Sequence, residues 1–136
     1  GQNNIELAKS HKIHTALTNI ANVRKKIPAL QSGLQVNIEL AGNKAAFYRV
    51  LVKNDVSQTA LVLLNKGDQD AEFLIEKYLQ AGNWVSQMSD DQVSINQSNV
   101  QLKAKVVAHG VQIWLHQGPI SNQLLLDELK RLMDNK

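Results

Sequence analysis

The sequence contains no cysteine, which excludes disulfide bonds, thiolate chemistry and zinc sites with sulfur ligands. Aromatic residues make up only 4% of the 136 residues, and the two tryptophans are Trp84 and Trp114. No run approaches the roughly 20 apolar residues of a membrane-spanning helix, so we expect no membrane association. A hydrophobic content of 43% with two prolines is typical of one folded globular unit.

The formal net charge is also small, at +3. Much of the positive charge lies in one N-terminal segment, at Lys9, Lys12, Arg24, Lys25 and Lys26. No aromatic residues that would stack on bases lie between them, so the pattern does not favour nucleic-acid binding. The first residue is Gly1 instead of methionine, which we interpret as a processing scar on a piece of a larger protein.

The histidines do not form a recognisable chemical motif. His11 and His14 lie three residues apart, but no third metal ligand follows at a set spacing. His109 falls in a predicted turn with a structural role, and His116 ends a strand without a nearby serine or cysteine nucleophile. We therefore predict no catalytic residue, no metal site and no cofactor in this chain.

An amphipathic helix is predicted near the N-terminus. Its apolar residues recur at helical spacing: Ile13, Ala16, Leu17, Ile20, Val23 and Ile27. Pro28 restricts the backbone of Ile27 and is predicted to end the helix. Gln31, Ser32 and Gly33 then complete the predicted break.

Beyond residue 33 the apolar period changes to 2, which predicts strands. The expected strands are 34–40, 45–53, 59–65, 71–78, 84–88, 93–96, 100–107 and 111–116. Turn residues separate them, and no helix long enough for a crossover intervenes. The sequence therefore predicts a mainly β fold, an antiparallel Greek-key β-sandwich of about eight strands flanked by an N-terminal and a C-terminal helix. A β-barrel is the alternative.

One of these strands carries the clearest signal. Residues 60–64 are apolar at every position, so this strand is expected to be covered on both faces of a sheet. Residues 65–68 follow with the small polar and glycine residues of a tight reversal, which predicts a hairpin. Lys66 and Asp68 are expected to hold this turn and to do no chemistry.

The last part of the chain predicts a second amphipathic helix. Ser121 is expected to cap it, and Asp127 is expected to pair with Arg131. Leu125, Leu129 and Leu132 line its apolar face, supplemented by Leu126 and Met133. The predicted boundaries are 1–33 for the N-terminal helical segment, 34–118 for the β-sandwich and 119–136 for the C-terminal helix.

Five phrases in order resemble the alpha-amylase family of glycoside hydrolases. LTNIANVRKKIPALQSG, at residues 17–33, resembles the last helix of that family's TIM barrel. FYRVL (47–51), ALVLLNKGD (60–68), LQAGNW (79–84) and VVAHGVQIWL (106–115) resemble its C-terminal all-β domain. The resemblance covers about residues 13–116 and is closest to cyclomaltodextrin glucanotransferases and related bacterial maltodextrin-acting enzymes.

The resemblance implies a chain without catalytic machinery. Members of the family carry their catalytic carboxylates on barrel loops, all of which would lie upstream of Gln2. Asp90 and Asp91 are sequence neighbours in a predicted turn, unlike the separated carboxyl pair that a glycosidase needs. The family also implies a secreted or periplasmic parent that acts on starch.

These observations lead to three hypotheses. The first is a structural module that packs against a catalytic barrel. When the barrel is missing, it predicts self-association through Ile13, Leu17 and Ile20, or refolding of the first helix onto the sandwich. The second is an accessory module for α-glucans that uses Trp84 and Trp114. The third is a scaffold sandwich unrelated to amylases.

The facing of the last strand bears on the second hypothesis. If Val111, Ile113 and Leu115 face inward, Trp114 points to the outer face with Gln112 and His116. For both tryptophans we favour burial beneath a neighbouring element over contact with a glucan.

Overall fold

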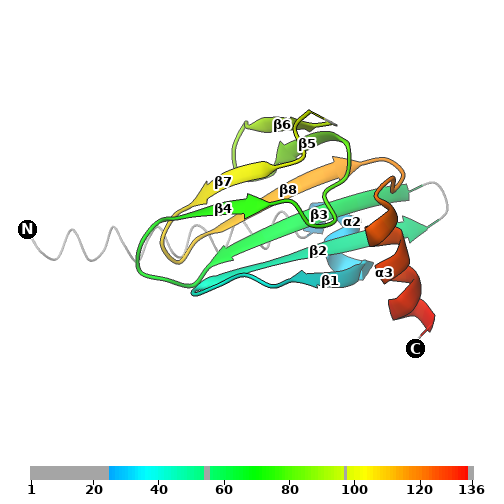
Figure 1. Ribbon diagram of the computed structural model, residues 1–136, viewed down its shortest axis with the longest axis horizontal. Coiled ribbons are helices and arrows are strands. Elements are labelled where there is room, and N and C mark those ends of the chain that lie inside the picture. The colour runs from blue at the N-terminus through cyan, green and yellow to red at the C-terminus, as the bar shows by residue number, and fades with distance from the viewer. Residues whose placement is uncertain (1–24, 54–55, 97, 135–136) are drawn as a thin grey trace, which may run out of the picture.

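The computed structural model describes residues 25–53, 56–96 and 98–134 (Figure 1). Its elements in order are α2 (Pro28–Ser32), β1 (Leu34–Ile38), β2 (Lys44–Lys53), β3 (Val56–Asn65), β4 (Ala71–Ile75), β5 (Gly82–Ser86), β6 (Gln92–Ile95), β7 (Leu102–Val106), β8 (Val111–Gln117) and α3 (Gln123–Asp134). The predicted N-terminal helix lies almost entirely outside the described residues.

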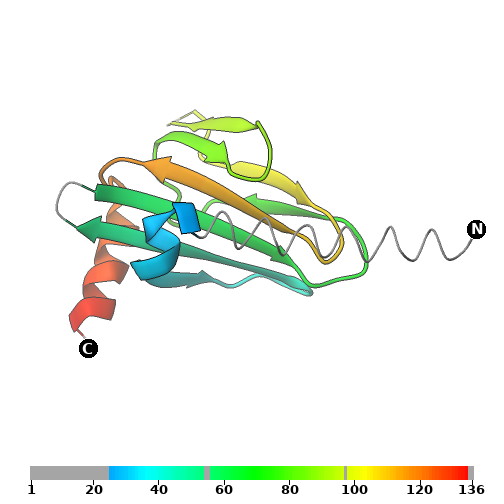
Figure 2. The same cartoon turned by 180° about the vertical axis from the view of Figure 1, so that it is seen from behind.

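The strands form two antiparallel sheets of unequal size. The larger sheet has the order β1-β2-β3-β8-β5-β6, and the smaller consists of β4 and β7. Figure 1 shows the smaller sheet in front of the larger one, and the reverse view in Figure 2 shows α2 against the opposite face. β8 returns to lie beside β3, as in a Greek-key arrangement. The prediction of a β-sandwich flanked by helices is confirmed.

β3 is one of the two central strands of the larger sheet. It pairs with β2 along its whole length and with β8 from Gln58 to Leu64. Leu61 and Leu63 are fully buried on one face, while Ala60 and Val62 are buried on the other. The burial of this apolar run on both faces confirms the prediction from its sequence.

The predicted hairpin after β3 is wrong. β3 and β4 belong to different sheets, so the turn at residues 65–68 carries the chain across the sandwich. Asn65 is 3% exposed and its side chain accepts a hydrogen bond from the Gly67 amide at 3.0 Å, which forms the local turn. The turn residues were recognised correctly, but the strands that they join do not pair.

The main core lies between the two sheets. Tyr48, Leu61 and Leu63 from the larger sheet meet Phe73 and Leu102 from the smaller one. Burial raises the pKa of the Tyr48 phenol, whose hydroxyl donates a hydrogen bond to the Lys77 carbonyl at 2.8 Å. We call the side of the larger sheet that contacts this core the inner face.

The backbone changes from extended at Ile27 to helical at Pro28. Ile27 is extended, with φ −114° and ψ 104°, as expected for a residue before proline. Pro28 then occupies the first turn of α2, where its missing N–H costs nothing. The residues predicted as a plain break therefore contain a short helix.

α3 differs from its prediction at three points. Its cap is Asn122, whose side-chain oxygen accepts a hydrogen bond from the Leu125 amide at 3.0 Å, and not Ser121. Arg131 pairs with Glu128 in place of Asp127, and this contact lowers the pKa of the Glu128 carboxyl. Leu125 and Leu129 are buried and Leu132 is half-buried, whereas Leu126 and Met133 are exposed. Neither described helix is long and apolar enough to cross a membrane.

Candidate functional site: the outer face and the loop clamp

The face of the larger sheet that is turned away from β4 and β7 is also apolar, and we call it the outer face. Alternation along the strands assigns its residues, because successive side chains point to opposite sides. It consists of Phe47, Arg49 and Leu51 on β2, Ala60, Val62 and Leu64 on β3, and Val111, Ile113 and Leu115 on β8. An antiparallel sheet with one face in solvent usually carries polar and charged residues on that face. The outer face is mostly apolar, which is typical of a sheet face that another layer covers.

α2 covers one end of the outer face (Figure 2). Ile27, Ala29 and Leu30 are buried against it, with exposed fractions of 3%, 0% and 8%. The Ala29 amide donates a hydrogen bond to the buried Gln58 side-chain oxygen at 3.0 Å. This bond fixes the point at which the chain enters the sandwich.

Beside α2 the outer face contains a groove of about 220 Å³. Six of its lining residues are apolar, namely Leu30, Phe47, Val62, Leu64, Val111 and Ile113, and the seventh is Arg49. Phe47 pairs directly with Val62, and Val62 with Ile113, so one cross-strand row forms the floor. Phe47, Leu51 and Leu64 are only partly buried. The groove is therefore an open apolar surface.

Arg49 is the only charged residue of this groove. Its Nη1 donates a hydrogen bond to the Gln35 side-chain oxygen at 3.3 Å, across the β1–β2 pair. Its Nε is buried and has no hydrogen-bond partner among the residues that the structure describes. A buried donor without a partner costs free energy, so the groove holds an unsatisfied polar group.

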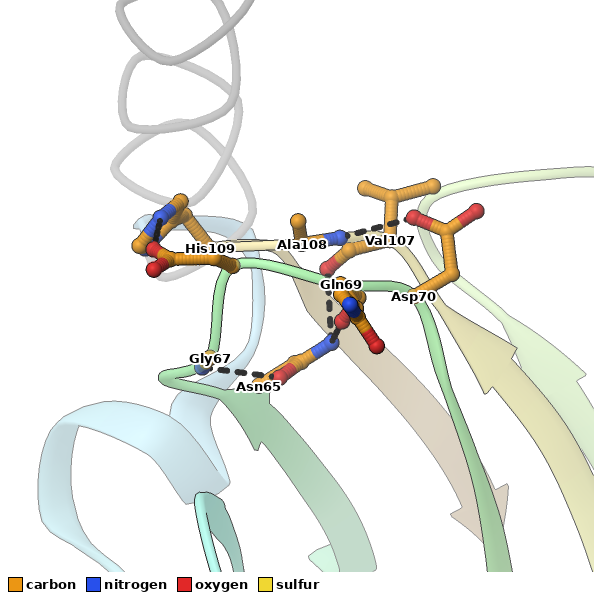
Figure 3. Close-up of polar contacts among 8 residues, drawn as sticks. Asn65, Gly67, Gln69, Asp70, Val107, Ala108 and His109 are labelled. Carbon is orange, nitrogen blue, oxygen red and sulfur yellow. Dashed lines mark hydrogen bonds and ion pairs between the residues drawn. The ribbon is translucent and has the colours of Figure 1, made fainter.

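A polar cluster at one end of the sandwich joins the two sheets, and we call it the loop clamp (Figure 3). The Asn65 side-chain amide donates to the carbonyls of Gln69, Val106 and Val107, at 2.8, 3.0 and 3.2 Å. The Asn65 side chain, at the end of β3, therefore contacts both the segment that leads into β4 and the end of β7. In Figure 3, dashed lines lead from Asn65 to Gly67 on one side and toward Gln69 and Val107 on the other.

The rim of the loop clamp is charged. His109 has a positive φ of 56° and its ring nitrogen lies 2.8 Å from the Asp68 carboxylate. Asp70 accepts a hydrogen bond from the Ala108 amide at 3.0 Å and lies 3.6 Å from Lys105. These contacts agree with the structural roles predicted for His109 and Asp68. Exposed pairs of this kind contribute little stability, so Asn65 is the principal connection.

His116 belongs to a buried polar node on the inner face. Its ring lies 5.2 Å from Trp84, and its Nε2 lies 3.1 Å from the Ala81 carbonyl. Burial lowers the pKa of His116, and the hydrogen bond with Ala81 opposes this shift. The Trp84 indole donates to the Gln80 carbonyl at 2.9 Å, while the Gln80 amide donates to Thr59 at 2.8 Å. The node fastens the β4–β5 connection to β3.

Both tryptophans lie in the inner core. Trp84 is 0% exposed and Trp114 is 4% exposed, so neither indole offers a face on which a sugar ring could stack. The facing considered for β8 is reversed: Trp114 points inward and Ile113 points to the outer face. The alternation was correct, but apolar residues on both sides of β8 left its direction undetermined.

The remaining candidate residues do not gather into a site. Asp91 accepts a hydrogen bond from Ser89 at 3.1 Å, within the exposed turn between β5 and β6 that also contains Asp90. Within residues 25–53, 56–96 and 98–134, no three histidine, aspartate or glutamate side chains lie close enough to hold a metal ion. His11 and His14 lie outside the described residues.

Comparison with known proteins adds evidence on the fold. No protein-family model and no curated protein matches this chain. Among solved structures, the α-amylase of Anoxybacillus superimposes with a TM-score of 0.60 at 17% identity, over 79% of this chain and 22% of that one. The α-amylase of Geobacillus thermoleovorans, complexed with acarbose, gives 0.59 at 13% identity, over 77% and 22%.

AmyP, solved in complex with maltose, is a third neighbour, with a TM-score of 0.56 and 12% identity over 69% of this chain and 18% of that one. The chain therefore shares the fold of a part of each of these three proteins and spans about a fifth of their length. At these identities the likeness concerns the fold.

The residues that define the groove were missed in the sequence. The groove residues Phe47 and Arg49, with Leu51 further along the outer face, alternate with Tyr48 and Val50, so a period of 2 already separates them onto one face. An arginine between two large apolar residues on a shared face is the available signal. This pattern indicates an apolar sheet face, of the kind that another layer covers, that also contains one positive charge.

Proposed function

We propose that this chain is a non-catalytic structural module of a starch- or maltodextrin-acting enzyme, and that its outer face packs against a catalytic barrel. The observation that carries the proposal is the open apolar groove on the outer face, formed by Phe47, Leu64 and their neighbours. An apolar surface of this kind on a sheet is stable when another layer covers it. The fold of the chain, shared with part of several α-amylases, supports a barrel as that layer.

The path of the chain supports the same arrangement. Ile27 and Leu30 are anchored on the outer face, so a domain that precedes residue 25 would join the sandwich on that side. Residues 17–33 resemble the last helix of a barrel, which would then sit directly beside the groove. In this proposal the cyclomaltodextrin glucanotransferases remain the enzyme group that the sequence phrases favour.

Two steps test the proposal. The coding sequence upstream of Gly1 should encode a barrel with catalytic carboxylates. The 136-residue chain, added to that barrel produced separately, should raise the barrel's thermal inactivation temperature. Phe47→Asp should remove this protection, because it places a charge in the docked surface.

The matched control is Leu74→Asp. Leu74 lies on β4 in the smaller sheet, and its side chain is exposed to solvent. This variant should protect the barrel as well as the wild type does. Circular dichroism melts of both variants establish that each is folded. Absence of an upstream barrel, or equal protection by both variants, would contradict the proposal and favour the unrelated scaffold.

The α-glucan-binding hypothesis makes a different prediction. Binding through Trp84 and Trp114 requires the core to open, because both indoles are buried. Titration with maltoheptaose should then change the tryptophan fluorescence and the amide spectra of both residues. Unchanged spectra at millimolar sugar would reject glucan binding and leave the structural role in place.

A further inference from the structure

Arg49 gives the outer face a chemical preference beyond its apolar character. The guanidinium carries its charge at all physiological pH values and presents donors in a planar fork. One donor, Nη1, contacts Gln35, while the buried Nε has no partner within residues 25–53, 56–96 and 98–134. None of the ion pairs among the described residues includes Arg49.

A carboxylate is the group that best satisfies this arrangement. It accepts two parallel hydrogen bonds from an arginine fork and neutralises the charge in the same contact. The rest of the groove is apolar, and its volume of about 220 Å³ has room for one or two aliphatic side chains. The matching occupant thus combines apolar side chains with one Asp or Glu.

We propose that the groove receives a segment of the catalytic barrel in which a carboxylate, flanked by apolar side chains, pairs with Arg49. This inference rests on the proposed function and adds the chemistry of the partner surface. Arg49 then acts as a specificity-determining residue, because an apolar surface without a carboxylate would bury the guanidinium charge without a counter-charge.

Charge argues against two other occupants of the groove, a second copy of the chain and the N-terminal segment at residues 1–24. A second copy, docked through the same face about a two-fold axis, would bring two Arg49 guanidinium groups toward each other. Residues 1–24 contain a single acidic residue, Glu6, far along the sequence from α2. The matched amylase chains, in contrast, extend well beyond the part that this fold covers.

The first experiment uses small probes on the 136-residue chain. 4-Phenylbutyrate supplies an apolar group with a carboxylate, and 4-phenylbutanol is its uncharged control. The acid should bind at least about tenfold more tightly, with the Arg49 Nε–Hε NMR signal shifted at saturation. Arg49→Met, which keeps the aliphatic stem, should abolish the preference. Equal binding of acid and alcohol, or no binding of either, would overturn the inference.

The source of the occupant is tested on the same NMR signal. In the free chain, the Arg49 signal should be unchanged by dilution and by Glu6→Gln. A change on dilution would assign the groove to a second copy. A change in Glu6→Gln would assign it to the N-terminal segment, and either result would overturn the proposal of a barrel segment.

Binding of Arg49→Met to the barrel separates this inference from the proposed function. Arg49→Met should weaken the association about tenfold, although removal of the orphan donor should not lower the melting temperature of the isolated chain. If Phe47→Asp blocks association and Arg49→Met does not, the inference fails and the proposed function stands. If neither variant matters, the outer face is not the docking surface and both fail.

Discussion

The two faces of the larger sheet have similar sequences and different surroundings. The inner face is closed by β4, β7 and α3, and it contains Leu61, Leu63 and Trp114. The outer face contains Ala60, Val62 and Ile113, yet α2 covers only one end, and a groove remains open beside it. The same strands thus contribute to one complete core and one incomplete one.

The comparison teaches how to separate folding residues from docking residues. An inner-face residue contacts other layers of this chain, so its removal acts on stability. A residue in the groove, such as Leu64, is only partly buried, so its removal should cost less stability. In the proposed function, the open part of the outer face is the surface that another layer covers.

Two adjacent leucines test this comparison with the largest expected effect. Leu63 is fully buried on the inner face, and Leu64 is partly buried in the groove. Leu63→Ala should cost about 3–5 kcal/mol of the free energy of unfolding, and Leu64→Ala about 1 kcal/mol. Urea denaturation of the isolated chain measures both. Equal losses would mean that the outer face is as complete as the inner one.

The loop clamp closes the inner face, and Asn65→Ala tests its contribution. The substitution removes the donor for three carbonyls, of which Val107 keeps a second hydrogen bond, from the Gly110 amide. We expect a loss of about 2–3 kcal/mol, measured by urea denaturation. Gln69→Ala is the control, because Gln69 contributes only its backbone carbonyl to Asn65. A neutral Asn65→Ala would show that packing alone joins the sheets.

His116 makes the inner face sensitive to acid. Burial lowers its pKa in the folded state, so the unfolded chain binds the proton at a higher pH than the folded chain does. The stability due to neutral His116 is complete above the ordinary histidine pKa, and it declines as pH falls toward the lowered value. Urea denaturation of wild type and His116→Gln at several pH values between about 8 and about 5, which bracket the usual histidine pKa, measures how the free energy of unfolding depends on pH in each protein. An identical pH dependence in the two proteins would contradict this role.

The smallest effect is expected at the start of α3, which covers an end of the inner core. Asn122→Ala should cost about 1 kcal/mol because the Leu125 amide loses its cap. Ser121→Ala should change stability by less than about 0.5 kcal/mol, since the Ser121 side chain is exposed and its backbone amide contacts Gln80. Thermal denaturation that ranked the two variants in the opposite order would restore Ser121 as the cap.

Local features of the fold could be predicted from the sequence. The eight strands follow from period-2 alternation, and the all-apolar run at residues 60–64 correctly indicated a central strand. The turn residues at Asn65 and Gly67 were also recognised. Each of these features depends on residues that are close together in the chain.

The errors concern contacts between distant residues. Asn65 bonds to carbonyls more than forty positions away, so its turn could not be identified as a crossover from local sequence. Trp114 and Ile113 are both buried, and hydrophobicity alone cannot decide which of them faces the sandwich core. The alternation along β2 places Arg49 on one face with Phe47, but the groove that it lines also depends on residues of other strands, such as Val62 and Ile113.

The affinity of the 136-residue chain for a separately produced barrel tests the central claim most directly. Isothermal titration should show that Phe47→Asp weakens this affinity at least about tenfold, while Leu74→Asp leaves it within about twofold of wild type. That result would establish the outer face as the docking surface. Equal affinities for the wild type and Phe47→Asp would contradict the account.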